Sequence, residues 1–475
     1  MNNSYDFVVI GGGSAGYAAA RTAHELGMKT AVIDGAETLG GLCILRGCMP
    51  SKTLIESANR YRSMRRAEEF GLRAADTSVH PKEIVARKRV LIGEFANYRQ
   101  EQLADKRFDL IRGTASFSGA NSLTVSTLDG GETFEVEFRS ALIATGSKVA
   151  RVPIDGLEET GYWTSNDILE AESLPDSIIV LGGGAIAMEM ACYLEGLGKT
   201  VTVVQRSGQL LSGSDEDVAK ALEDAVSSRD NFTVITGTKI LNVSRDDATG
   251  AKKVTFLHGE TERSVEADEI LQALGRRANS DGLSLETAGI ESKRDGKVIT
   301  GLDQRTSREH IFAAGDVCGP HEIVHIAIEQ GEAAAKNAAV LLGFAEDKDT
   351  VQLMDYRVKI LGIFTHPEVA TVGLSEAEAK EQGLAVKTAS YPFDDHGKSM
   401  VMGETEGFVK MIADAESGEI VGAAVVGPEA VDLIHEVVVA MFYRSTVGSF
   451  VKIPHYHPTL SEIWLYPAEE ILYSD

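Results

Sequence analysis

Two segments of the chain repeat the same order of apolar residues, glycines and helix-forming residues. Residues 7–16 read FVVIGGGSAG and residues 178–187 read IIVLGGGAIA. Each begins as a buried strand and passes through glycines into a helix-compatible stretch, and a second strand-like run follows at residues 30–33 or 200–204. Glycines spaced in this way between a strand and a helix are typical of a dinucleotide-binding unit, so we expect two such units.

The glycines of each turn have a physical role. They allow a tight turn and let backbone N–H groups approach a pyrophosphate, whose charge then lies at the positive end of the following helix. The predicted positions are Gly11, Gly13 and Gly16 in the first copy, and Gly182 and Gly184 in the second, where Ala187 replaces the third glycine. A plain strand–turn–helix without a nucleotide is the alternative for either copy.

The end of the second strand in each unit indicates which nucleotide binds. Asp34 lies 23 residues after Gly11, where an acid accepts a hydrogen bond from the ribose 2′-hydroxyl. The first unit is therefore predicted to bind an unphosphorylated adenosine ribose. In the second unit, the residue 23 positions after Gly182 is Gln205, and Arg206 follows it. Because a cation pairs with a 2′-phosphate, the second unit is predicted to favour NADP(H), with a solvated surface role as the alternative for Arg206.

Charge and hydropathy exclude several classes of partner. Acidic residues outnumber basic ones by 71 to 46, giving a net charge of −25, which disfavours nucleic acids and anionic membranes. Glu189 and glycines interrupt the most apolar stretch, residues 178–194, so no membrane span is expected. The N-terminal residues contain no basic leader, and we expect a cytoplasmic location. We propose no metal site from this sequence.

Strand patterns divide the 475 residues into four stretches. We expect a nucleotide-binding domain at residues 1–150, a second at 151–275, a central stretch at 276–348 and an α+β module at 349–475. Strands at 141–146 and 269–275 set the first boundaries, and amphipathic helices are expected at 375–382 and 429–443. The predicted fold class is α/β, with two Rossmann-like domains and a C-terminal α+β domain.

Two of the four cysteines, Cys43 and Cys48, lie five residues apart. A straight helix would separate their Cα atoms by about 8–9 Å, beyond the ~7 Å limit for a disulfide. A bridge therefore requires a distorted turn, which Gly47 permits. Because cytosolic disulfides are usually catalytic or redox-sensing, we interpret the pair as a redox-active dithiol, with two inert thiols as the alternative. Cys192 and Cys318 are interpreted as structural.

A candidate base lies near the end of the chain. Exchange between thiols needs a base that titrates near neutrality, and imidazole is that side chain. His457 precedes Glu462, whose carboxylate would orient the ring. The alternative is that Thr459 and Glu462 form a helix capping box, to which His457 merely leads.

The whole chain resembles the FAD-dependent pyridine nucleotide-disulfide oxidoreductases, which include dihydrolipoamide dehydrogenase, glutathione reductase and mercuric reductase. The motifs that carry this resemblance are GGGSAG at 11–16, GGLCILRGCMPSK at 40–52, ATG at 144–146, GGGAIAMEMA at 182–191, LGRRAN at 274–279, AAGD at 313–316, FTHPEVATVGLSE at 364–376 and HYHPTLSE at 455–462. The resemblance implies FAD in the first site, completed by residues 276–348, NAD(P)(H) in the second, and a C-terminal interface domain that builds a homodimer.

The resemblance also implies individual roles. Cys48 would face the flavin and Cys43 would exchange with the substrate, while Lys52 would approach the flavin and pair with Glu189. Further cofactor contacts are implied at Ala115, Gly146, Gly275 and Asp316.

Within the family, the C-terminal motif is most similar to dihydrolipoamide dehydrogenase. This implies oxidation of a dihydrolipoyl group on a carrier protein, or of a small dithiol, with NAD(P)+. A reductase of glutathione or another small disulfide, an NAD(P)H oxidase or transhydrogenase without a disulfide substrate, and a non-catalytic nucleotide-binding scaffold are the alternatives. The chain departs from the usual family pattern at Leu42, Leu45, Arg46, Ala185 and Gln205.

Overall fold

The computed structural model describes residues 3–345 and 351–474, and the chain divides into two compact units. The first unit combines residues 1–50, 86–150 and 275–355, and the second combines residues 51–85, 151–274 and 356–475.

The first unit is built on a six-stranded sheet. Its order is β1 (Ser4–Ile10), β2 (Thr30–Asp34), β3 (Asp109–Phe117), β4 (Ser122–Thr127), β5 (Thr133–Ile143) and β15 (Ile311–Ala313). Strand β1 also pairs with β5, so β3, β2, β1, β5 and β15 run parallel, while β4 pairs antiparallel with β3 and β5. Strand β15 comes from the central stretch of the sequence and joins the sheet of the N-terminal stretch.

The continuous apolar run of β1 is explained by burial on both faces of the sheet. Phe7 and Val9 belong to one hydrophobic core, and Val8 and Ile10 belong to the other. Side chains of a strand alternate between faces, so a strand covered on both sides must be apolar at every position. The buried strand predicted from this run is confirmed, and it pairs in parallel with both of its neighbours.

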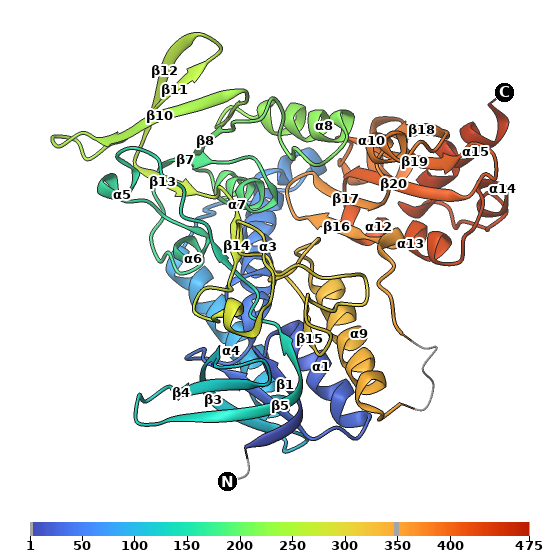
Figure 1. Cartoon of the computed structure of the whole chain (residues 1–475). Coiled ribbons are helices and arrows are strands. Elements are labelled where there is room, and N and C mark those ends of the chain that lie inside the picture. The colour runs from blue at the N-terminus through green and yellow to red at the C-terminus, as the bar shows by residue number, and fades with distance from the viewer. Residues whose placement is uncertain (1–2, 346–350, 475) are drawn as a thin grey trace. The chain divides into compact units, whose positions relative to one another are not determined.

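Two alanine-rich helices, α1 (Ser14–Glu25) and α9 (Val324–Leu342), pack side by side on this sheet (Figure 1). The backbones of the two helices are in direct contact: a Cβ atom built on Gly331 of α9 would lie 2.2 Å from the carbonyl oxygen of Ala15 in α1. Only glycine fits at such a contact. The remaining elements of this unit are β6 (Ser147–Val149), β14 (Arg276–Ala278), the 3-10 helix η2 (Leu285–Ala288) and α2 (Gly41–Arg46).

Two long helices carry residues of both units. They are α3 (Cys48–Arg65) and α4 (Pro81–Ala104), and the short η1 (Ala67–Phe70) lies between them in the sequence.

The second unit contains the other predicted nucleotide-binding sheet. Its four parallel strands have the order β13 (Glu269–Gln272), β7 (Ser177–Leu181), β8 (Thr200–Val204) and β9 (Phe232–Ile235). An antiparallel sheet of β10 (Thr238–Arg245), β11 (Lys252–His258) and β12 (Thr261–Ala267) follows in the chain (Figure 1). The helices of this part are α5 (Leu157–Thr160), α6 (Ser165–Ile168), α7 (Ala185–Gly196) and α8 (Glu216–Ser227).

The C-terminal part is α+β, as predicted. Its antiparallel sheet has the order β16 (Ile360–Ile363), β17 (Glu368–Gly373), β20 (Ile420–Gly427), β19 (Phe408–Asp414) and β18 (Val386–Pro392). The other elements are η3 (Tyr356–Val358), α10 (Glu376–Glu381), η4 (Phe393–Asp395), α11 (Gly397–Met402), α12 (Ala430–Leu433), α13 (His435–Phe442), α14 (Val447–Phe450), η5 (Ser461–Trp464) and α15 (Leu465–Tyr473).

The prediction of a single helix at 429–443 is wrong in one respect. The helix is divided at Ile434 into α12 and α13, although Ile434 keeps helical backbone angles and its carbonyl still accepts from the Val438 N–H. The apolar periodicity continues through this residue, which is why the division left no mark in the sequence pattern.

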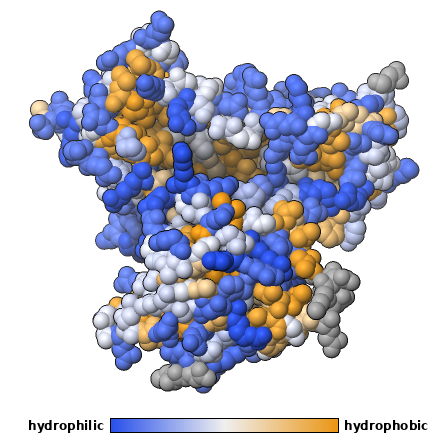
Figure 2. Space-filling view, in the orientation of Figure 1, coloured by the Kyte–Doolittle hydropathy of each residue, from blue (hydrophilic) through white to orange (hydrophobic). Residues whose placement is uncertain are grey.

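The face shown in Figure 2 is mostly hydrophilic, in keeping with the acidic composition. No helix within residues 3–345 and 351–474 is both long and apolar enough to cross a membrane.

The glycine contacts of the first unit generate a stability prediction. A Cβ atom on Gly16 would lie 1.8 Å from the carbonyl oxygen of Gly11, so Gly16→Ala must push the turn away from α1. We expect a loss of about 1–3 kcal/mol of unfolding free energy, and a lower FAD content after purification. Urea unfolding and flavin absorbance measure both. Gly93→Ala in α4 is the matched control, because its Cβ meets open space and should leave both quantities unchanged or slightly raised.

Candidate active site

The two glycine-rich turns have the same geometry. In the first, the Gly11 N–H donates to the Ile33 carbonyl at 2.8 Å, and in the second the Gly182 N–H donates to the Val204 carbonyl at 3.0 Å. Gly11 and Gly182 have φ values of +104° and +112°, which favour glycine. The duplication inferred from the sequence is thus present in the backbone.

Both turns lead into helices whose first N–H groups lack a side-chain cap. The N-cap residues are Gly13 for α1 and Gly184 for α7, both extended, and neither helix has an acidic residue in its first turn. Helix N-termini of this kind offer several backbone donors and a positive dipole end to a phosphate. In the same unit as α1, the buried hydroxyl of Thr145 has no hydrogen-bond partner among the described residues. These features fit a dinucleotide at each turn.

Asp34 ends β2 and is held in place by backbone donors. Its carboxylate accepts from the Gly12 N–H at 2.7 Å and from the Ala36 N–H at 2.8 Å. The strand that carries Ala115 is close by, because a Cβ on Gly35 would lie 2.8 Å from the side chain of Thr114. The predicted ribose and adenine contacts, Asp34 and Ala115, therefore lie in one part of the first unit.

The corresponding position in the second unit is occupied by a buried amide. The side chain of Gln205 packs against the glycine turn, since a Cβ on Gly183 would lie 3.0 Å from its Cγ atom. Its Oε1 accepts from the Arg206 N–H at 3.1 Å, and the Arg206 side chain is exposed. The selectivity predicted for these two residues stays a prediction.

Cys43 and Cys48 lie on either side of a break between two helices. Helix α2 ends at Arg46, Gly47 leaves helical geometry with φ −133° and ψ −118°, and α3 begins at Cys48. A Cβ on Gly47 would lie 3.2 Å from the Cα of Cys43, so the chain folds back closely on itself here. The distorted turn expected between the two cysteines is confirmed, and both are half-buried.

The start of α2 is fixed against the first glycine turn. A Cβ on Gly41 would lie 2.7 Å from the Cα of Gly13, and Gly41 has a φ of +75°. Cys43 follows two residues later. The contact therefore places the helix that carries Cys43 directly beside the predicted pyrophosphate site.

A cation that the sequence analysis missed lies in this region. The guanidinium of Arg99 stacks on the ring of Tyr17 at 4.3 Å from its centroid, and its Nε and Nη1 atoms are buried without a hydrogen-bond partner among the described residues. Burial lowers the pKa of Arg99, and the nearby Tyr17 and Cys43 oppose that shift. An arginine in a long helix gives no sequence signal of this placement.

The other two cysteines are buried in separate environments. Burial raises the pKa of the Cys318 thiol to about 12 and raises that of Cys192 as well. Thiols that stay protonated are poor nucleophiles, which agrees with a structural role for both.

Asp316 is part of a polar group in the first unit. Its carboxylate accepts from the Ser147 hydroxyl at 2.6 Å, and Ser147 in turn accepts from Arg276 at 2.8 Å. Gly146 and Gly275 adjoin these residues in the chain, with φ values of +69° and +113°. The polar group around Asp316 thus joins residues from distant parts of the sequence, and the cofactor contacts predicted for Gly146, Gly275 and Asp316 stay predictions.

Lys52 and Glu189 form the ion pair that the resemblance implied. Lys52 Nζ lies 2.8 and 2.9 Å from the two carboxylate oxygens, and Glu189 is 5% exposed. The same carboxylate accepts from the Phe364 N–H at 3.1 Å, and Lys52 lies 4.6 Å from the centre of the Phe364 ring. Their predicted contact with the cofactor stays a prediction.

His457 and Glu462 are hydrogen-bonded to one another. The carboxylate oxygens lie 3.0 and 3.2 Å from His457 Nδ1, which leaves Nε2 of this exposed ring directed elsewhere. The alternative capping box is not formed: η5 begins at Ser461, and the Thr459 hydroxyl donates to the Tyr456 carbonyl. Glu462 does accept from the Thr459 N–H at 3.3 Å, so its carboxylate is held from two sides.

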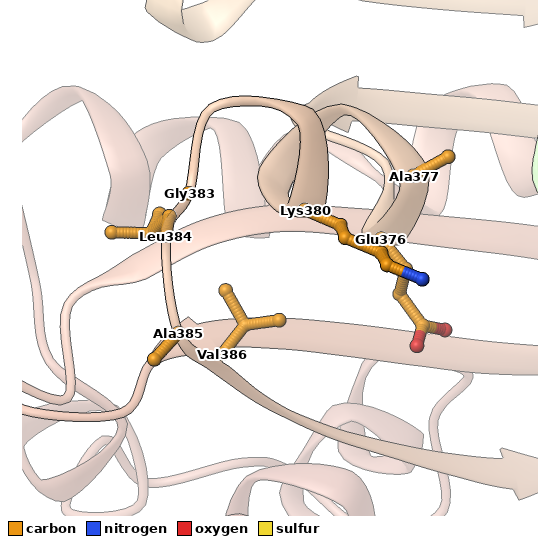
Figure 3. A pocket seen from close by; sticks show the side chains of 7 residues that line it. All are labelled: Glu376, Ala377, Lys380, Gly383, Leu384, Ala385 and Val386. Carbon is orange, nitrogen blue, oxygen red and sulfur yellow. The ribbon is translucent and has the colours of Figure 1, made fainter.

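A surface pocket of about 530 Å³ lies between α10 and β18 (Figure 3). It is lined by Glu376, Ala377, Lys380, Gly383, Leu384, Ala385 and Val386. None of the predicted site residues lines it.

Comparison with known families decides the identity of this architecture. Residues 5–331 match the pyridine nucleotide-disulphide oxidoreductase family, and residues 361–467 match its dimerisation domain. The chain belongs to the pyridine nucleotide-disulphide oxidoreductase family. Members of this family bind FAD and NAD(H), so the chain is an FAD-dependent disulfide oxidoreductase, and its dimerisation domain supports a homodimer.

Individual relatives of this oxidoreductase cover nearly its whole length. It is 34% identical to a dihydrolipoyl dehydrogenase of Bacillus subtilis over 97% of both chains, and 34% identical to that of Chlamydia muridarum over 98% of this chain and 96% of the relative. Among solved structures, LpdA of Mycobacterium tuberculosis has a TM-score of 0.86 at 28% identity, covering 98% of this chain and 99% of that one.

The buried ion pair of this oxidoreductase generates a second prediction. Lys52→Met would leave the Glu189 carboxylate buried without its cation, and we expect a loss of about 1–3 kcal/mol of unfolding free energy. The double variant Lys52→Met/Glu189→Leu should recover part of it. Urea unfolding at equal FAD saturation measures the change.

Lys199→Met is the control for that prediction, because its partner Asp176 is 95% exposed. It should cost less than about 1 kcal/mol. A Lys52→Met variant as stable as the parent would contradict the importance of the pair.

Proposed function

We propose that the enzyme oxidises a dihydrolipoyl dithiol with NAD+ through a Cys43–Cys48 disulfide. The observation that carries this proposal is the turn at Gly47, which folds Cys43 back toward Cys48 beside the first glycine turn. The names of the full-length relatives favour the dihydrolipoyl group over other thiols.

In this proposal the protein supplies the nucleophiles and the base. As in the family that the chain resembles, His457 of one subunit acts at the disulfide of the other subunit of the homodimer. His457 Nε2 takes the proton of one substrate thiol, and the resulting thiolate attacks Cys43 Sγ, breaking the disulfide and releasing Cys48 as a thiolate. The second substrate thiol, once deprotonated, attacks the first substrate sulfur and closes the substrate disulfide, releasing Cys43 as a thiolate. FAD, when bound, passes the electron pair from the dithiol to NAD+.

Glu462 orients the His457 ring for this proton transfer. Its bond to Nδ1 fixes the tautomer whose Nε2 is free to accept a proton, and its charge stabilises the imidazolium that results. Lys52, paired with Glu189, is assigned to the flavin side of Cys48, and Asp316 to the flavin's ribityl–phosphate region. Gly11, Gly13, Gly16, Asp34, Ala115 and Gly146 are assigned to the rest of FAD, and Gly182, Gly184, Gln205, Arg206 and Gly275 to the nicotinamide dinucleotide.

The proposal also includes a partner and a location. We assign the dihydrolipoyl group to a carrier protein, with free small dithiols as simpler substrates, and we place the enzyme in the cytoplasm. The alternatives are a reductase of glutathione or another small disulfide, and an NAD(P)H oxidase or transhydrogenase without a disulfide substrate.

Substitution of each cysteine tests this function. Cys43→Ser and Cys48→Ser should each abolish turnover of dihydrolipoamide while leaving NADH-dependent reduction of ferricyanide, which bypasses the cysteines. The long-wavelength absorbance of a thiolate lying against the flavin should persist in reduced Cys43→Ser and vanish in Cys48→Ser. Steady-state kinetics and absorbance spectra measure these outcomes.

Two results would contradict the proposal. Full dihydrolipoamide turnover in Cys43→Ser would remove the disulfide from the mechanism. A wild-type enzyme that turns over glutathione disulfide but not lipoamide would favour the alternative substrate.

We also propose that the second site accepts NADP(H) as well as NAD(H). Gln205 places an uncharged amide where a carboxylate would repel a 2′-phosphate, and the exposed Arg206 adds a positive charge next to it. Gln205→Glu should shift the ratio of kcat/KM values toward NAD(H), and Arg206→Ala should weaken NADP(H) alone. Equal losses with both nucleotides in Arg206→Ala would show that this arginine does not contact the 2′ position.

A further inference from the structure

A buried histidine lies behind the His457–Glu462 pair. His396, between η4 and α11, is 1% exposed, and its ring makes edge contacts with Phe393 and Tyr466 at centroid distances of 6.5 Å. Its Nδ1 lies 2.8 Å from the hydroxyl oxygen of Ser399, which is fully buried. The ring is thus fixed at one nitrogen and by packing on its edges.

The other nitrogen of His396 points toward the carboxylate that orients His457. His396 Nε2 lies 3.7 Å from Glu462 Oε1, and it is a buried atom with no hydrogen-bond partner among the described residues. The distance exceeds the ordinary range of about 2.7–3.2 Å for an N–H···O hydrogen bond by about half an ångström. Hydrogen bonds of catalytic groups are often long without substrate and shorten when it binds.

The surroundings determine which nitrogen of His396 carries the proton. Burial lowers the pKa of His396, with Glu462 opposing that shift, so the ring is neutral and has one N–H. If Nδ1 carried the hydrogen, the lone pair of Nε2 would face the negative carboxylate, which is unfavourable. The favoured tautomer therefore has Ser399 donating to Nδ1 and an N–H at Nε2 directed at Glu462.

We propose that His396 is a positioning residue that holds the Glu462 carboxylate in the orientation needed to support His457. The resulting chain runs from the Ser399 hydroxyl through His396 and Glu462 to His457, and all four residues belong to the second unit. This inference rests on the proposed function of His457 as the base for dithiol oxidation. Because Glu462 also accepts from the Thr459 N–H, His396 is the third donor directed at this carboxylate.

The test compares two variants that differ in one N–H group. His396→Gln keeps an amide N–H near the position of Nε2, whereas His396→Phe keeps an aromatic ring but has no donor. We expect kcat for dihydrolipoamide oxidation to fall about tenfold in His396→Phe and less than about threefold in His396→Gln, in line with the loss of one charge-assisted hydrogen bond. NADH-dependent ferricyanide reduction should be unchanged in both.

A double-mutant cycle distinguishes the positioning of Glu462 by His396 from a general disruption of the structure. If His396 acts through Glu462, His396→Phe should cause no further loss in a Glu462→Gln background, because the carboxylate it positions is gone. Ser399→Ala is a smaller change that serves as a second variant if His396→Phe folds poorly. It removes the hydroxyl that fixes His396 Nδ1, and it should lower kcat by part of the amount expected for His396→Phe. Multiplicative losses in the cycle, or equal losses of dihydrolipoamide and ferricyanide turnover, would overturn the proposal.

His457→Ala distinguishes this inference from the function on which it rests. If His457→Ala keeps dihydrolipoamide turnover, the assignment of the base fails. If His457→Ala loses turnover while His396→Phe keeps it, only the positioning role of His396 fails.

Discussion

The arrangement of the first unit depends on backbone segments that touch without side chains between them. Gly16 lies against the Gly11 carbonyl, Gly41 against Gly13, and Gly331 against Ala15. Each contact joins a different element to the first turn of α1, so the glycine turn, the cysteine-bearing helix and α9 meet at one point. Dispersion and shape, not hydrogen bonds, fix these contacts, and a single added methyl group at any of them displaces a whole element. Glycine makes up 47 of the 475 residues, above the usual ~7%, and this meeting point explains part of that excess.

The two glycine turns show how the same backbone geometry occurs with different side-chain packing. In the first copy the third glycine cannot carry a side chain, whereas the second copy has Ala187 at that position, fully buried. The second turn instead receives the Gln205 side chain against Gly183. The two copies therefore share the strand–turn–helix geometry but differ in the side chains that pack around it. This difference is expected, because a phosphate constrains the backbone of such a turn, whereas the rest of a nucleotide constrains the side chains around it.

Local patterns in the sequence were sufficient for the elements and for the glycine turns, because strand periodicity and positive φ values are properties of neighbouring residues. The break at Gly47 and the bond between His457 and Glu462 were also accessible, since they involve residues five apart or fewer. Arg99 and His396 were not: each acquires its surroundings from distant segments, Tyr17 for the first and Glu462 for the second. Only half of the capping box at Thr459 is formed: Glu462 accepts from the Thr459 N–H, but the Thr459 hydroxyl donates to the Tyr456 carbonyl instead of capping a helix.

Strand β15 has a consequence for biosynthesis. It pairs with residues Ala141–Ile143 of β5, yet it is made about 170 residues later, after the complete sheet of β7, β8, β9 and β13. While the ribosome produces the intervening chain, this part of the β5 edge has no partner and offers open N–H and C=O groups to any other strand. The part of the chain before β15 therefore carries an unpaired strand edge until residue 313 emerges, and a nonsense mutation before that point would release a fragment with an exposed, aggregation-prone edge.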